Sequence, residues 1–423
     1  YLSLPEEVLV TVMRDHQKYF AVEDANGKLA PHFLTVLNTE VDAEGQAIIR
    51  HGNERVLRSR FKDAQFFWDT DQKISLTERV ALLDAVTFQK ELGSYAWKSE
   101  ENRKVASQLA TAAKAGGAAL DEAALLEAVR LAKTDLTAEL VKEFTELQGI
   151  VGGLYARAQG HGPVVADAIY WQYSPASIED PIPPTVEGQL LGLADRIQTI
   201  VAMFSIGNAP TGSKDPFALR RAANSIIKIL AESNLPLTIS AVIAAGDSQE
   251  DAVAAFLTER LSFYLKDVRG FSYDVVNAVL AAGADDVRDA IARAEALSTV
   301  RGSDDFLAIS AAFKRSKNIL RQAAEKGEQP AALNSAALTQ TEEKALHAAS
   351  TELAAKVTLL RQQRNYAAAL EAVATLRPAV DAFFDKIMVM DPNPELRAAR
   401  LALIQSVLDG FSGIADFSEI VVA

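Results

Sequence analysis

From Leu76 onward, the apolar residues of this chain recur at three- and four-residue spacing, the repeat of an amphipathic α-helix. Segments rich in glycine or proline interrupt this pattern at 116–117, 174–187, 207–216 and 326–335. No internal repeat of fixed period joins the segments. The chain must therefore fold mainly as separate helices connected by loops.

The first forty residues follow a different pattern. Two β-rich runs within residues 8–37 flank Asn26-Gly27, a dipeptide that favours a tight hairpin because both residues tolerate a positive φ. Together with the helical remainder, this hairpin predicts an α+β fold that is predominantly α-helical, with a small β-containing region at the N-terminus.

The chain has 423 residues, more than one domain usually holds, and its breakers predict four segments. We expect a β-containing region over 1–75, a helical domain over 76–235, a helical connecting domain over 236–330 and a helical bundle over 331–423. The chain begins at Tyr1 without an initiator Met, so we expect it to be part of a longer protein. It has no run of about 18 apolar residues, so we expect no membrane partner.

The sequence lacks local motifs for bond-making chemistry. It has no cysteine and only five histidines, no two of them closer than sixteen residues. Asp135 and Asp195 lie in apolar helical segments and are able to meet in space. They are weak candidates for a metal or phosphate site, and the alternative is that both are helix-cap or surface carboxylates.

The net charge of −13 disfavours non-specific binding of nucleic acid. A nucleic-acid partner therefore requires local clusters of Lys and Arg, and three stretches qualify, at 50–62, 214–228 and 314–328. The alternative for each stretch is a solvated helix or loop face. The candidate RNA-binding residues in these stretches are Arg55, Arg58, Lys214, Arg220, Arg221, Lys314, Arg315 and Lys317.

Residues 211–221 are the most unusual of these segments. We expect Asp215 to cap a helix that has Pro216 in its first turn and runs to about Ser233. Its predicted buried stripe is Leu219, Ala223, Ile226 and Leu230. Lys214 would then lie at a helix N-terminus, where backbone N–H groups favour anions. Two interpretations stay open, a phosphate-binding loop and a structural loop whose arginines pair with neighbouring carboxylates.

Residues 383–405 predict a helical hairpin, because two apolar stripes flank a turn that contains two prolines. Arg397 and Arg400 on its second helix are expected to be exposed, which makes them further candidates for contact with RNA.

Six long blocks of the chain resemble the β subunit of bacterial two-subunit glycyl-tRNA synthetases. They occur in the family's order and extend over nearly the whole chain. The blocks are LPEEVLVTVMRDHQKYFAVEDANGKLAPHFLTVLN, GNERVLRSRFKDAQFFWDTD, FQKELGS, EFTELQGIVGGLYA, GSKDPFALRRAA and AFFDKIMVMDPNPELRAARLALI.

The resemblance implies a subunit of an α2β2 glycine-tRNA ligase in the cytoplasm. In this family the α subunit carries the class II active site, which binds ATP, magnesium and glycine. The β subunit recognises tRNA(Gly). We therefore expect no catalytic residue and no cofactor in this chain, with the α subunit and tRNA(Gly) as its partners.

The resemblance also assigns two of the helical segments. Residues 76–235 are similar to an HD-like domain, in which only Asp195, within LADRIQ, matches the metal ligands of active HD hydrolases. Residues 331–423 are similar to a helical anticodon-binding domain. Leu396, Arg397 and Arg400 match its signature, whereas Ala399 stands where Asn is usual. The alternatives are a metal-dependent HD-type phosphohydrolase and a non-catalytic helical scaffold.

Overall fold

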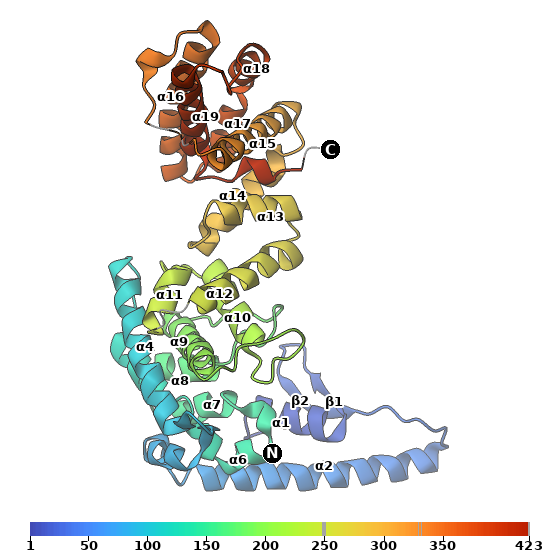
Figure 1. Cartoon of the computed structure of the whole chain (residues 1–423). Helices are drawn as coiled ribbons and strands as arrows, with labels where there is room; N and C mark the ends of the chain where they lie inside the picture. The colour runs from blue at the N-terminus through green and yellow to red at the C-terminus, as the bar shows by residue number, and fades with distance from the viewer. Residues whose placement is uncertain (248–250, 329, 331, 422–423) are drawn as a thin grey trace. The chain divides into compact units, whose positions relative to one another are not determined.

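The computed structural model describes residues 1–247, 251–328, 330 and 332–421 (Figure 1). They are predominantly α-helical, with two small two-stranded antiparallel sheets, so the predicted fold class is confirmed. The chain forms two compact units, which we call unit 1 and unit 2. Unit 1 holds the described residues of Tyr1–Ile229, Ser233–Leu237 and Ala241–Val253, and unit 2 holds those of Leu230–Glu232, Thr238–Ser240 and Ala254–Ala423.

Among the described residues, nine helices, four short helical turns and four strands lie wholly within unit 1. The helices are α1 (Glu6–Thr11), α2 (Ala43–Asp71), α3 (Leu76–Arg79), α4 (Tyr95–Ala115), α5 (Glu122–Leu131), α6 (Glu139–Glu143), α7 (Ile150–Ala158), α8 (Pro163–Tyr170) and α9 (Val186–Ser205). The turns and strands are η1 (Val12–His16), η2 (Val80–Ala85), η3 (Thr134–Thr137), η4 (Thr145–Leu147), β1 (Phe20–Glu23), β2 (Leu29–Leu34), β3 (Thr87–Gln89) and β4 (Gly93–Ser94).

The N-terminal hairpin is confirmed, but it is shorter than predicted. Strands β1 and β2 pair antiparallel, and Gly27 has a φ of +72° in the turn between them. Residues 8–16, predicted as strand, are helical instead, because Val8, Leu9 and Val12 are all buried on one helical face.

Residues 134–158 form η3, α6, η4 and α7, joined by short connections. Gly152 and Gly153 lie in α7 and allow close packing against α8, because a Cβ atom at Gly153 would lie 2.7 Å from the carbonyl oxygen of Ala166. Helix α9 passes through the centre of the unit, in contact with α4, α5 and α8 (Figure 1).

Three helices contribute residues to both units. They are α10 (Leu219–Glu232), α11 (Ile239–Ala245) and α12 (Asp251–Phe263). Helix α10 begins at Leu219, three residues after the predicted first helical residue, Pro216. Ala218 precedes it with a φ of +53°, and the Asp215 carboxylate caps it by accepting from the backbone N–H groups of Leu219 and Arg220. The predicted buried stripe Leu219, Ala223, Ile226 and Leu230 is confirmed.

Unit 2 is a bundle of helices around one continuous core. Phe306, Phe313 and Phe417 form an aromatic cluster in this core, with centroids 5.3 Å apart for both Phe417 pairs. Its remaining elements are η5 (Tyr264–Val268), α13 (Tyr273–Ala281), α14 (Val287–Val300), α15 (Asp304–Glu325), η6 (Ser335–Ala337), α16 (Thr341–Gln362), α17 (Tyr366–Ala374), α18 (Arg377–Lys386), α19 (Pro394–Phe411) and η7 (Phe417–Glu419).

The two helices of the predicted hairpin of 383–405 are present as α18 and α19, but both pack mainly against α15 and α16. The four predicted segments divide the chain more finely than the two units do, and their boundaries stay a prediction. Their boundary between 330 and 331 falls at residue 331, which lies outside the described residues. Among the described helices, none is both long enough and apolar enough to cross a membrane.

Two Gly→Ala variants test the packing of α7 against α8. In Gly153→Ala, the new Cβ would lie 2.5 Å from the Cβ of Tyr170, so we expect the free energy of unfolding to fall by about 1–3 kcal/mol. Gly52→Ala in α2 is the control, because no atom lies within 4 Å of its new Cβ and alanine favours a helix by about 0.5–1 kcal/mol. Denaturant unfolding followed by circular dichroism measures both, and equal stability of the two variants would contradict this packing.

Candidate functional site

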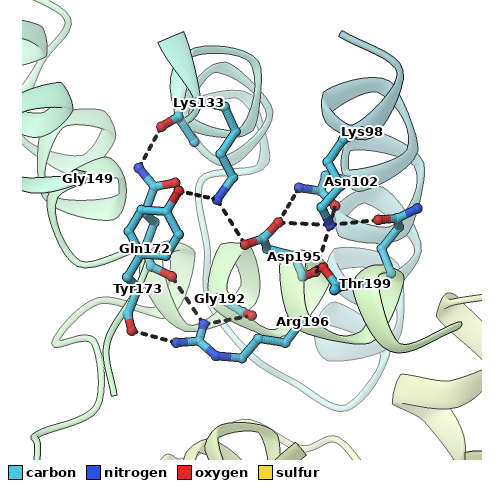
Figure 2. A network of polar contacts seen from close by, with 12 residues as sticks. Lys98, Asn102, Lys133, Gly149, Gln172, Tyr173, Gly192, Asp195, Arg196 and Thr199 are labelled. Atoms are coloured by element: carbon cyan, nitrogen blue, oxygen red, sulfur yellow. Dashed lines mark hydrogen bonds and ion pairs between the residues drawn. The ribbon is translucent and has the colours of Figure 1, made fainter. Parts of the chain in front are cut away.

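The core of unit 1 contains a buried network centred on Asp195 of α9 (Figure 2). Its carboxylate forms ion pairs with Lys98 of α4 and Lys133, both at 2.9 Å, and accepts a 2.9 Å hydrogen bond from Asn102. Lys98 and Asn102 lie four residues apart on α4 and therefore face Asp195 together. Lys133 also donates to the Tyr173 hydroxyl at 3.0 Å.

Burial and charge act in opposite directions on these groups. Burial opposes ionisation of Asp195, but the charges of Lys133 and Lys98 outweigh it and hold the pKa of Asp195 well below its usual range. Burial lowers the pKa of Lys98 to about 8, even though Asp195 partly offsets this effect. The carboxylate therefore stays ionised at neutral pH and is stabilised by internal cations.

Arg196 extends the network to the proline-rich loop. Burial lowers the pKa of its guanidinium to about 10. The guanidinium donates to the backbone carbonyls of Gln172 and Gly192, at 3.1 and 3.0 Å, and to those of Tyr173, Ser174 and Pro175, at 2.8, 3.0 and 3.2 Å. It thus joins α9 to residues 172–175 (Figure 2).

Asp135 of η3 is fully buried near this network. Its Oδ2 atom accepts from the backbone N–H of Gly149, at 2.6 Å, at the start of α7, and its Oδ1 atom accepts from no described residue. Burial raises the pKa of Asp135 to about 6, although the hydrogen bond from Gly149 opposes the shift. Asp135 thus holds the start of α7 from outside that helix. The alternative of a helix-cap or surface carboxylate does not describe it, because it is fully buried and neither η3 nor α7 has a side-chain cap.

These residues do not fit a metal site. The carboxylate oxygens of Asp195 already bind two ammonium groups, and Asp135 binds a backbone N–H group. Among the described residues, no three His, Cys, Asp or Glu side chains are placed to hold a metal ion. The HD-like resemblance therefore does not extend to metal ligands here.

The predicted RNA-binding cations of unit 1 lie in two separate places. Arg55 and Arg58 are exposed on α2, and within the described residues neither forms an ion pair. Lys214 and Arg221 are exposed near the start of α10, whereas Arg220 donates to the carbonyl oxygen of Gly212 at 2.8 Å. Because Asp215 already caps α10, its first N–H groups are not available to a phosphate.

The predicted cations of α15 are exposed in unit 2. Arg315 stacks on the Phe384 ring, 4.4 Å from its centroid, and Lys317 pairs with Asp416 at 2.5 Å. Lys314 forms no ion pair within the described residues and lines a groove of about 850 Å³. Arg321, two turns further along the same face of α15, lines this groove as well.

The prediction that Arg397 and Arg400 are exposed is wrong. The Arg400 side chain is only 5% exposed and pairs with Glu343 at 2.6 Å and Asp391 at 2.7 Å. Arg397 is 21% exposed and pairs with Glu328 at 2.5 Å. Both arginines hold α19 to neighbouring segments, because a buried cation must be neutralised within the protein.

The sequence analysis missed Lys98, Asn102 and Lys133 around Asp195, and Tyr273 and Arg321 at the groove. The i, i+4 spacing of Lys98 and Asn102 is common to many solvated helix faces, so it gives no signal without the fold. Arg321 was detectable, because it lies seven residues after Lys314 and on the same helical face.

Comparison with known families identifies both parts of the chain. Residues 1–281 match the family described as "Glycyl-tRNA synthetase beta subunit". The chain belongs to this glycyl-tRNA synthetase β subunit family. Residues 309–413 match the family described as "DALR anticodon binding domain", which corresponds to most of the bundle in unit 2. The resemblance found in the sequence is thus confirmed.

Individual relatives in the glycyl-tRNA synthetase β subunit family agree. A glycine–tRNA ligase β subunit from Acidobacterium capsulatum is 66% identical over 435 residues, covering 100% of this chain and 62% of the relative. Those from Phenylobacterium zucineum and Moorella thermoacetica are 41% and 39% identical, and each is also covered over 62% of its length. The chain thus spans about three fifths of these relatives.

The Asp195 network predicts a non-additive set of variants. Asp195→Ala leaves two buried ammonium groups unpaired, so we expect it to cost about 3–5 kcal/mol and to lower the melting temperature of unit 1 by roughly 10 °C. The triple variant Lys98→Met, Lys133→Met, Asp195→Leu removes all three charges and should recover most of this loss. Calorimetry measures the melting temperatures of both variants. If Asp195→Ala melts at the wild-type temperature, the Asp195 ion pairs do not stabilise unit 1 as described.

Asp135 predicts a pH dependence. The pKa of Asp135 in the folded chain, about 6, lies above its ordinary value. Protonation of Asp135 therefore stabilises the fold fully below about pH 4, and this stabilisation is lost as the pH rises to about 6. Asp135→Asn does not titrate, so its melting temperature should rise relative to the wild type between about pH 4 and pH 7. Asp63→Asn, at an exposed position of α2, is the control. If the melting temperatures of Asp135→Asn and the wild type differ by the same amount from about pH 4 to about pH 7, the Asp135 charge is not buried.

Proposed function

We propose that this chain is the tRNA-binding part of a glycine–tRNA ligase β subunit. The observation that carries the proposal is the anticodon-binding domain match over 309–413. It falls on unit 2, where Lys314 and Arg321 are exposed beside a groove. Unit 2 then binds the anticodon end of tRNA(Gly), and unit 1 contributes the exposed Arg55, Arg58, Lys214 and Arg221 to other parts of the tRNA.

The aminoacylation reaction itself belongs to the α subunit in this proposal. ATP, magnesium and glycine bind there, in an α2β2 assembly in the cytoplasm, and this chain supplies no catalytic group. Its exposed cations neutralise RNA phosphates, and unpaired bases are read by stacking and by hydrogen bonds to their edges. The excess of acidic residues repels RNA outside the correct footprint.

The two alternative functions have less support. A metal-dependent phosphohydrolase requires Asp135 and Asp195 to bind metal, but both carboxylates already have partners in the protein. A helical scaffold that only joins α subunits would leave the exposed cations of α15 without a role. This scaffold predicts no measurable tRNA binding by the chain at moderate salt.

Binding of tRNA(Gly) by this chain tests the proposal directly. We expect salt-sensitive binding of the intact tRNA, and binding weaker by roughly tenfold when the anticodon loop is deleted, because stacking of unpaired bases is lost. Fluorescence anisotropy with labelled transcripts measures both affinities. Arg397 and Arg400 are unsuitable sites for such a test, because charge reversal there would disrupt ion pairs within unit 2. Equal affinity for the two transcripts would refute anticodon binding.

A further inference from the structure

The groove of unit 2 is formed by segments far apart in the sequence. Helices α13, α15 and α19 and the turn η7 line it, and its volume is about 850 Å³. This volume lies within the range of about 300–1,000 Å³ that is usual for ligand sites in proteins. Part of its lining, α13, lies outside the residues that match the anticodon-binding domain.

One wall of the groove is cationic. Lys314, Lys317 and Arg321 recur at positions i, i+3 and i+7 of α15 and therefore share one helical face. Lys317 is neutralised by Asp416, but within the described residues Lys314 and Arg321 form no ion pair. These two exposed side chains are available to phosphate groups that enter the groove.

Other residues that line the groove present groups that suit nucleotide bases. Tyr273 at the start of α13 is 58% exposed and lines the groove, so its ring is accessible to a partner. Unpaired bases stack on such rings. Side-chain amides from three different helices line the same groove, and amides both donate and accept hydrogen bonds, as the edges of bases do, although the Gln405 amide already donates to Asp409 at 2.7 Å. The amides belong to Asn277, Asn318 and Gln405.

Carboxylates line the groove beside the cations. They belong to Asp409, Asp416 and Glu419, of which Asp416 pairs with Lys317 and Asp409 accepts from Gln405. They repel anionic groups, so phosphates are expected to approach along Lys314 and Arg321. By contrast, a carboxylate accepts hydrogen bonds from the exocyclic amino groups of bases such as cytosine. A mixed set of cations, carboxylates, amides and an aromatic ring therefore matches nucleotides, which carry both phosphates and amphoteric bases.

We propose that this groove binds unpaired nucleotides of the anticodon loop, with a base stacked on Tyr273 and phosphates bound by Lys314 and Arg321. The proposal rests on the proposed function and names the site within unit 2 that performs it. The RNA-binding surface of unit 2 is then the exposed face of α15 with the start of α13, and not the arginines of α19.

Two pairs of variants in the full chain test the proposal, with intact tRNA(Gly) and the transcript that lacks the anticodon loop as probes. Tyr273→Ala should weaken binding of the intact tRNA by about tenfold and leave binding of the loop-deleted transcript unchanged. Tyr273→Phe keeps the ring and should retain wild-type affinity. The double variant Lys314→Ala, Arg321→Ala should lower the slope of log affinity against log salt by about two.

The matched control is Lys344→Ala, Lys356→Ala, which removes two exposed charges of α16 away from the groove and should leave the slope unchanged. The proposal is overturned, and the proposed function survives, if the wild type prefers the intact tRNA but the groove variants bind it equally well. If the wild type binds neither transcript, the proposed function fails as well. Circular dichroism spectra that match the wild type show that the variants are folded.

Discussion

The cost of burying charge governs both units of this chain. Lys98, Lys133 and Asp195 are tolerated in the core of unit 1 because each ammonium group meets the same carboxylate. Arg400 is tolerated in unit 2 because Glu343 and Asp391 neutralise it. Such groups fix α4, α9 and α19 in place, since the loss of one partner leaves an uncompensated charge in a medium that solvates it poorly.

The same constraint separates structural cations from those available to a partner. A guanidinium or ammonium group that is buried and paired cannot bind a phosphate without breaking the fold, whereas Lys314 and Arg321 are exposed and lie beside a groove. In a protein with a net charge of −13, such local cationic faces are where RNA can bind.

Features encoded by local sequence were predicted well, and features set by distant partners were not. The hairpin at Gly27 and the buried stripe of α10 follow from turn chemistry and periodicity. The start of α10 was misplaced because Ala218 adopts a positive φ. The burial of Arg400 was missed because its partner Glu343 lies 57 residues away. The cations around Asp195 were missed for the same reason, since Lys98 is 97 residues distant along the chain.

The central claim is that exposure and pairing decide which cations bind RNA. Chemical labelling of lysines, read by mass spectrometry with and without bound tRNA(Gly), tests this claim most directly. The account predicts that Lys98 and Lys133 are unreactive in both states, because they are buried, and that Lys314 is reactive in the free chain and protected by the tRNA. Equal labelling of Lys314 in the free and the tRNA-bound chain, or ready labelling of Lys98 and Lys133, would contradict it.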